Sequence, residues 1–140
     1  VFESLHAKDV AKDISDISTG LMVDREQLLA WDTDMIFFDA SSMELVNMDY
    51  SEDPTFFHQL KAVKEGQLYQ WPNSTWHWSN VEIPLVTAYY VGALLYPEAF
   101  DDIEFEKKTA EIFELFLNKS DYLSILEKED VGYKKVILGE

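Results

Sequence analysis

The sequence predicts a single α/β domain with three layers (αβα), in which helices flank a short, mostly parallel sheet. Segments with the composition of strands alternate along the chain with segments of helical length and pattern, an order typical of layered α/β domains. The chain has 140 residues, of which 47% are hydrophobic. It is therefore long enough to bury one ordinary core and too short for two, so residues 1–140 are expected to form one domain.

The first third of the chain predicts two helices and one strand. Residues 2–14 carry apolar side chains at loosely helical spacing. Asp24 is placed as an N-cap, with Gln27 three residues later as its capping-box partner, and a short helix is expected over 25–31. Residues 35–38 are a continuous apolar run, which indicates a strand buried on both faces. We expect this to be a central strand of the sheet.

The middle of the chain predicts two more short helices and a second strand. The helices are expected over 41–48 and 54–60, the second with a proline in its first turn. Residues 64–66 are typical of a turn. Residues 67–71 alternate and are rich in β-forming side chains, which predicts a strand that ends before Pro72.

The last third of the chain is expected to be helical. Residues 83–96 are almost wholly apolar, and the length of this run favours a buried helix that Pro97 terminates. Further helices are expected over 103–117 and 121–127, followed by a tail of mixed composition.

Charge and composition exclude several classes of protein. The formal net charge is −16 and Arg25 is the only arginine, which argues against nucleic-acid binding because that needs clustered cations to neutralise phosphates. The chain has no cysteine, so redox chemistry does not indicate a compartment. The sequence has no nucleophile elbow, phosphate-binding glycine loop or His-Glu metal motif, so we expect no catalysis and no bound cofactor or metal.

An unusual aromatic segment follows the second predicted strand. Trp76 and Trp78 flank His77, and Tyr69 and Trp71 lie just upstream. In an extended segment, side chains two residues apart point to the same side of the chain, whereas the intervening one points away. Trp and Tyr give large, rigid contact areas with a polar edge, which suits ligand binding. The alternative is that these rings close the end of the sheet as part of the core.

Short polar side chains follow the first predicted strand. Asp39, Ser41 and Ser42 come at the end of the apolar run, and ligands of open α/β sheets gather at the carboxyl ends of the strands. These groups could bind the rim of a ligand. The simpler interpretation is that they cap the next helix.

Four segments of the chain carry motifs: 5–11 (L-H-A-K-D-V-A), 24–36 (D-R-E-Q-L-L-A-W-D-T-D-M-I), 60–69 (L-K-A-V-K-E-G-Q-L-Y) and 94–100 (L-L-Y-P-E-A-F). These motifs, and the order of the elements, resemble the C-terminal lobe of the iron-siderophore, haem and cobalamin family of substrate-binding proteins. His6 stands where the family usually has glycine, and Thr33 where it often has proline.

The resemblance implies a lobe of an extracytoplasmic protein, periplasmic or lipid-anchored, that delivers a ferric chelate to an ABC importer. An N-terminal lobe, a linking helix and an export signal precede this point in family members, and the ligand binds in the cleft between the lobes. Glu26 matches the glutamate that docks into arginine pockets of the permease's transmembrane subunits. The aromatic segment matches the ligand-contacting region, which would include Trp76, Trp78, His77, Trp71 and Tyr69.

Two other ligand classes remain open. The same fold could bind haem or a corrinoid, with His77 as an axial ligand, although a loop histidine more often hydrogen-bonds locally. A carbohydrate-binding module is the rival from a different class, since Trp76, Trp78 and Tyr69 could stack on pyranose rings.

Overall fold

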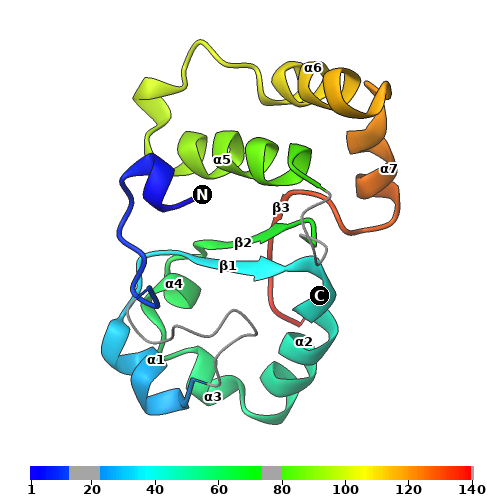
Figure 1. The fold of residues 1–140 in the computed structure, drawn as a ribbon. Helices are drawn as coiled ribbons and strands as arrows, with labels where there is room; N and C mark the ends of the chain where they lie inside the picture. Colours follow the sequence, from blue (N-terminus) through cyan, green and yellow to red (C-terminus); the bar gives the residue numbers. More distant parts are fainter. Residues whose placement is uncertain (13–22, 74–79, 140) are drawn as a thin grey trace.

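Helices cover both faces of a three-stranded sheet, so the α/β prediction is confirmed (Figure 1). The computed structural model describes residues 1–12, 23–73 and 80–139. Helices α5, α6 and α7 lie on one side of the sheet and α1 to α4 on the other. In chain order the elements are η1 (Glu3–Leu5), α1 (Arg25–Trp31), β1 (Ile36–Asp39), η2 (Ala40–Ser42), α2 (Met43–Glu52), α3 (Pro54–Phe57), α4 (Lys61–Lys64), β2 (Leu68–Trp71), α5 (Glu82–Leu95), η3 (Pro97–Ala99), α6 (Phe105–Leu117), α7 (Tyr122–Lys128) and β3 (Lys134–Lys135).

The strand order of the sheet is β1-β2-β3, with β1 and β2 parallel and β2 and β3 antiparallel. The expectation that the strand at 35–38 is central was therefore wrong: in the part of the chain that the structure describes, β1 is an edge strand and β2 is central. Every residue of β1 is partly exposed, whereas Leu68, Tyr69 and Gln70 of β2 are buried. The apolar run of β1 reflects cover on its two faces, because Phe37 packs under Phe2 and Phe38 packs into the opposite cluster.

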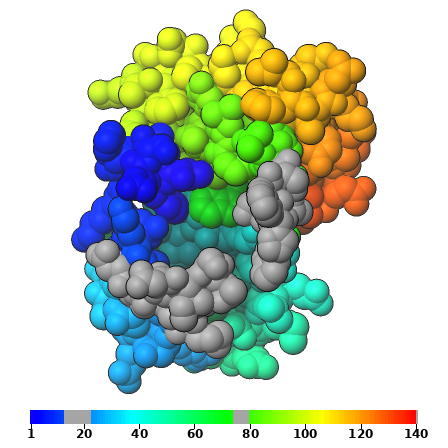
Figure 2. Space-filling model, viewed as in Figure 1, coloured from blue at the N-terminus to red at the C-terminus, as the bar shows by residue number. Residues whose placement is uncertain are grey.

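The amino-terminal segment is not the helix that its spacing suggested. The structure describes one turn of 3-10 helix, η1, which ends at His6 in the left-handed region with φ 53°. On the face drawn in Figure 2, the described amino-terminal residues (blue) lie against both helical layers. Phe2 is placed 5.7 Å from Phe37, measured between ring centroids. This segment therefore covers part of the sheet.

Local sequence signals place the helices on the α1 side of the sheet. Asp24 Oδ1 accepts a hydrogen bond from the backbone N–H of Gln27 at 2.8 Å, which confirms the predicted N-cap of α1. The helix predicted over 41–48 begins at Met43 and continues to Glu52. The predicted turn is confirmed by Gly66, whose φ of 62° favours glycine.

An ion pair fixes the start of β1 to α4. Lys61 Nζ lies 2.6 Å from Asp34 Oδ1. The hydrogen bond and the positive charge of Lys61 hold the pKa of the Asp34 carboxyl below its usual value. Both groups are largely exposed, so the pair positions the segment more than it stabilises the fold.

The core consists of two clusters, one in each helical layer. The larger lies among α5, α6 and α7, and the smaller lies between the sheet and the helices on its other side. Helix α5 approaches η3 closely at Gly92, where a Cβ would lie 2.3 Å from the Phe100 ring. The buried members of the larger cluster are Ile83, Val86, Ile112, Phe113, Leu123 and Leu126, and those of the smaller are Ala62, Leu68 and Val136.

Two buried threonines give a matched test of this packing. Thr109 in α6 is 1% exposed, and its hydroxyl has no hydrogen-bond partner within the described residues. Thr87 in α5 is 5% exposed, and its hydroxyl donates to the Ile83 carbonyl at 2.8 Å and lies 2.9 Å from the Tyr133 hydroxyl. We expect Thr109→Val to raise the free energy of unfolding by about 1 kcal/mol, and Thr87→Val to lower it by about 1–2 kcal/mol. Urea denaturation measures both, and a change of the same sign in both variants would contradict the hydrogen-bond assignment.

Candidate ligand-binding edge of the sheet

The carboxyl ends of β1 and β2 lie at one edge of the sheet, because the two strands are parallel neighbours. Asp39 at the end of β1 is the register partner of Trp71 at the end of β2. In open α/β sheets, ligands bind outside the carboxyl ends of the strands. This edge is therefore the place where a ligand site is expected, and it brings together two segments that are 32 residues apart in the sequence.

The polar groups after β1 hydrogen-bond among themselves. Asp39 Oδ1 accepts from the backbone N–H of Ser41 at 2.9 Å and from its hydroxyl at 2.6 Å. The hydroxyl of Ser42 donates to the Asp39 carbonyl at 2.7 Å. The capping interpretation holds for Asp39, which caps the 3-10 turn η2 that leads into α2, whereas Ser42 at the N-cap of α2 makes no side-chain capping bond.

Trp71, which was predicted to contact a ligand, lies at this edge and is partly exposed. Its ring stacks on Phe37, with centroids 5.2 Å apart and an interplanar angle of 13°. Phe2 packs against both rings, 5.9 Å from Trp71 and 5.7 Å from Phe37. Two segments that are distant from it in sequence thus hold Trp71 in place, which lowers the entropy cost of using its remaining surface for binding.

Tyr69 lies one step further into the sheet and is 8% exposed. Its ring stacks on Phe37 at 5.6 Å and meets Tyr90 of α5 edge-on at 6.3 Å, while its hydroxyl donates to Gln67 Oε1 at 2.7 Å. Tyr69 therefore supports Phe37 and Trp71 from the core side and offers little surface to a ligand. Burial also raises the pKa of the Tyr90 hydroxyl, so this interior stays uncharged.

The remaining aromatic residues predicted to contact a ligand are Trp76, His77 and Trp78, and they lie outside the described residues. Their flanks are described: Asn73 follows β2, and Asn80 precedes α5. The ligand contacts predicted for these three residues, and for Trp71 and Tyr69, stay predictions.

Phe2 and Phe37 belong to this edge and were not predicted to do so. The Trp71 and Tyr69 rings both stack on the Phe37 ring, and the Phe2 ring also packs against Phe37. The continuous apolar run of β1 does not indicate which face each side chain takes, and only the register with β2 shows that Phe37 lies on the face that carries Trp71.

Glu26, the residue matched to permease docking, lies in the first turn of α1 and is exposed. No ion pair or hydrogen bond joins its carboxylate to another described residue. A carboxylate at this position is favoured by the helix dipole. Within the described residues, therefore, Glu26 is an exposed carboxylate without an ionic partner.

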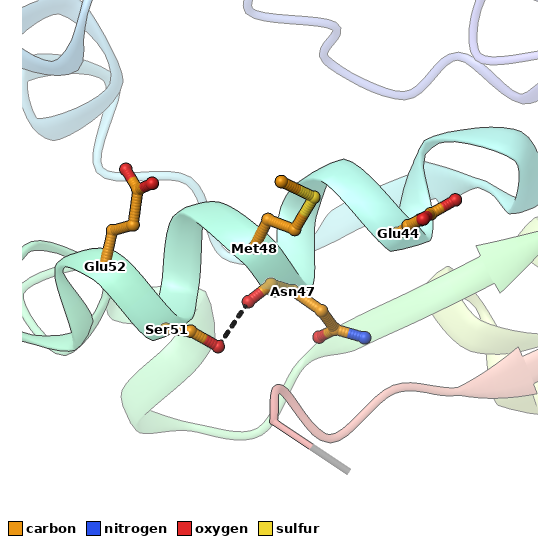
Figure 3. Close-up of a pocket in the computed structure, with 5 residues that line it drawn as sticks. All are labelled: Glu44, Asn47, Met48, Ser51 and Glu52. Carbon is orange, nitrogen blue, oxygen red and sulfur yellow. Dashed lines mark hydrogen bonds between the residues drawn. The ribbon is translucent and has the colours of Figure 1, made fainter.

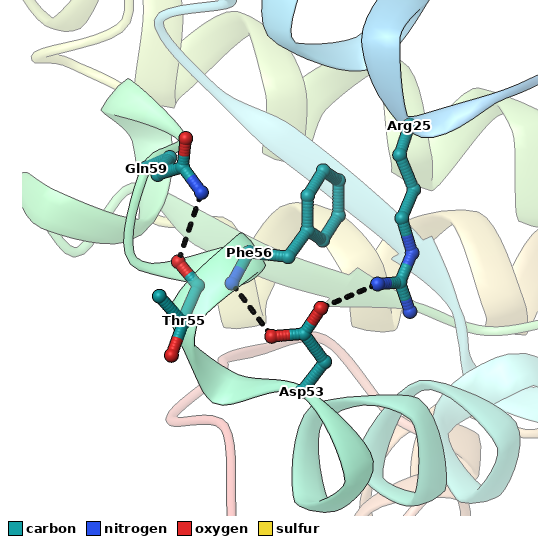
Figure 4. A network of polar contacts seen from close by, with 5 residues as sticks. All are labelled: Arg25, Asp53, Thr55, Phe56 and Gln59. Atoms are coloured by element: carbon teal, nitrogen blue, oxygen red, sulfur yellow. Dashed lines mark hydrogen bonds and ion pairs between the residues drawn. The ribbon is translucent and has the colours of Figure 1, made fainter.

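The neighbouring Arg25 is engaged within the protein and anchors α1 (Figure 4). Its Nη1 lies 2.6 Å from Asp53 Oδ2, and its guanidinium lies over the Phe56 ring, 4.8 Å from the centroid. The other oxygen of Asp53 accepts from the backbone N–H of Phe56 at 3.1 Å and caps α3. This network holds α1 against α3 and leaves Glu26 outside it.

Two hollows of the described structure lie away from Trp71 and Tyr69. One is an open depression of about 480 Å³ on the surface of α2 (Figure 3). The other, of about 340 Å³, is mostly apolar and lies between α1, β1, α2 and α3. Across residues 1–12, 23–73 and 80–139, no group of three or more metal-ligating side chains is placed to hold an ion.

Comparison with known proteins gives no assignment: no protein-family model matches the sequence, and no curated protein matches it. Within the described part of the chain, no helix is both long enough and apolar enough to cross a bilayer.

Proposed function

We propose that this chain is the C-terminal lobe of a substrate-binding protein of an ABC importer, in the family that carries iron-siderophores, haem and cobalamin. It binds a ferric chelate at the carboxyl edge of its sheet, as one wall of a cleft between two lobes outside the cytoplasmic membrane. It performs no catalysis, and its partners are the chelate, the N-terminal lobe of the same protein and the permease.

The observation that carries this proposal is the cluster of packed aromatic rings at the carboxyl edge of the parallel strands. Trp71 is held by Phe37 and Phe2 beside the end of β1, and the segment 74–79 with its two further tryptophans follows immediately in the chain. Bulky ligands with flat or apolar outer surfaces bind well to rigid aromatic side chains.

The second support is the environment of Glu26. A docking carboxylate must be exposed, unpaired in the free protein and mounted on a fixed element. Glu26 meets these conditions within the described residues, because α1 is anchored by Arg25 and Asp53 while Glu26 is exposed and takes no part in that network. A guanidinium of the permease could then bind both carboxylate oxygens.

Charge reversal at Glu26 tests the docking role. We expect Glu26→Lys in the two-lobed protein to reduce uptake of the chelate by about tenfold or more, because a lysine would repel the arginine that it faces. Binding of the chelate to the purified variant should remain unchanged, since Glu26 lies on α1 and not at the edge that carries Trp71.

The matched control is Glu106→Lys. Glu106 is the second residue of α6, as Glu26 is of α1, and both are exposed, so the two substitutions carry the same helix-dipole cost. Uptake that falls equally in both variants, or in neither, would remove Glu26 from the docking surface.

A further inference from the structure

Helix α2 has an outward face that the described structure contacts only at one border, where the Gly139 backbone N–H donates to Asn47 Oδ1 at 3.3 Å. The ten residues of α2 include none that is buried. The depression on its surface is lined by Glu44, Asn47, Met48, Ser51 and Glu52, which are spaced as one stripe along a helix (Figure 3). We call these five residues, with Leu45 at their border, the α2 face.

The α2 face has an apolar centre between acidic ends. Met48 is 56% exposed and Leu45 is 64% exposed. Glu44 and Glu52 lie four residues before and after Met48, and Figure 3 shows the three side chains projecting from the helix in one row. Asp49 adds a third acid to the helix, and α2 contains no lysine or arginine.

Within residues 1–12, 23–73 and 80–139, no cation pairs with the acids of α2. No ion pair joins Glu44, Asp49 or Glu52 to any of the described residues. A surface leucine and an adaptable methionine among uncompensated acids suit a partner that is itself apolar in the middle and basic at its edges.

Charge argues against two other occupants of this face. A second copy of the chain docked about a two-fold axis would set the acids of one α2 against those of the other, in a protein of net charge −16. A membrane surface with anionic headgroups would repel the same acids.

We propose that the α2 face is a docking site for an amphipathic basic helix, whose apolar stripe lies on Met48 and Leu45 and whose Lys or Arg side chains meet Glu44 and Glu52. The side chains of the α2 face form a ridge along the helix, and such a ridge packs into the groove between the side-chain ridges of a second helix. A helix therefore fits this face better than an extended strand does. The contact is small, so binding is weak, and added salt weakens it further. This inference does not depend on the ligand of the sheet edge.

The first test maps the contact on the unmodified chain. The probe is a synthetic amphipathic helix of leucine and lysine, about 14 residues long so that it spans α2. Titration into the ¹⁵N-labelled protein is expected to shift amide signals of residues 44–52 first and most strongly. A peptide of the same composition with its leucines scrambled around the helix should shift them far less. Shifts spread over the acidic surface, or concentrated elsewhere, would overturn the proposal.

The second test separates this face from net charge alone. Glu44→Lys/Glu52→Lys and the control Asp101→Lys/Asp102→Lys change the net charge equally, and all four acids are exposed. We expect the α2 variant to weaken peptide binding by about tenfold and the control to leave it nearly unchanged. Equal weakening would overturn the proposal. So would shifts of residues 44–52 that depend on protein concentration without peptide, because these would identify a second copy as the occupant.

Discussion

Replacing Gln70 by leucine is expected to lower the free energy of unfolding by about 2–4 kcal/mol, although the two side chains are similar in size. Gln70 is 1% exposed in the central strand, and its Nε2 donates to the carbonyls of Asp130 at 3.1 Å and Gly132 at 3.0 Å. Leucine would fill the space and leave both carbonyls without this donor. The loss would therefore come from unpaired polar groups and not from a cavity.

Urea denaturation followed by circular dichroism measures this effect. The matched control is Gln59→Leu, because Gln59 is exposed and its amide reaches the Thr55 carbonyl only at 3.4 Å (Figure 4). We expect the control to change stability by less than about 0.5 kcal/mol. Equal effects in the two variants would mean that the carboxyl-terminal tail is not held to β2 by Gln70.

Truncation of Phe113 to alanine is expected to cost about 3–5 kcal/mol, the largest effect of any substitution considered for this protein. Phe113 is 0% exposed at the centre of the cluster formed by α5, α6 and α7, and Tyr122 meets its ring edge-on at 5.1 Å. Its removal leaves a cavity that three helices cannot close without losing their own contacts.

Leu115→Ala is the control on the same helix. Leu115 lies two residues from Phe113 but is 79% exposed, so its truncation should change stability by less than about 0.5 kcal/mol. Thermal unfolding monitored by circular dichroism compares the two. A cost below about 1 kcal/mol for Phe113→Ala would contradict the assignment of this cluster as the core.

Much of the fold could be predicted because the secondary structure that short sequence signals favour is also the one found in the folded chain. The Asp24 cap, the Gly66 turn and the apolar run that becomes α5 each depend on a few neighbouring residues, and the structure has all three. The sheet order depends on pairing across the sequence, so it could not be predicted in the same way. A two-residue strand made of Lys134 and Lys135 has no strand-like composition, yet it makes β2 the central strand.

The candidate site was predictable only in part, for the same reason. Trp71 was recognisable as an aromatic residue at a strand end, and Glu26 through the family resemblance. Phe2 and Phe37 had no local signal, because their role arises from the register of β1 with β2 and from the path of the amino-terminal segment. The burial of Tyr69 likewise follows from its packing against α5, which no spacing in the sequence reveals.

The binding edge itself is tested most directly by a paramagnetic ferric chelate added to the labelled protein, with its diamagnetic gallium analogue as the control. The indole N–H signals of Trp71 and Trp31 show where the chelate binds. Trp71 lies at the carboxyl edge of the sheet, whereas Trp31 is the last residue of α1, which lies on one side of the sheet (Figure 1). A ferric trihydroxamate, a ferric catecholate and hemin cover the iron-containing ligand classes of the family, and an oligosaccharide covers the rival class.

We expect one of the ferric chelates to broaden the Trp71 indole signal saturably and to leave that of Trp31 sharp, while its gallium analogue shifts Trp71 without broadening it. Trp71→Ala should weaken binding by about tenfold, as loss of a stacked aromatic contact does. Three results would contradict binding of a ferric chelate at the edge that carries Trp71. They are saturable binding of the oligosaccharide alone, no binding of any iron complex, and equal broadening of the two indole signals.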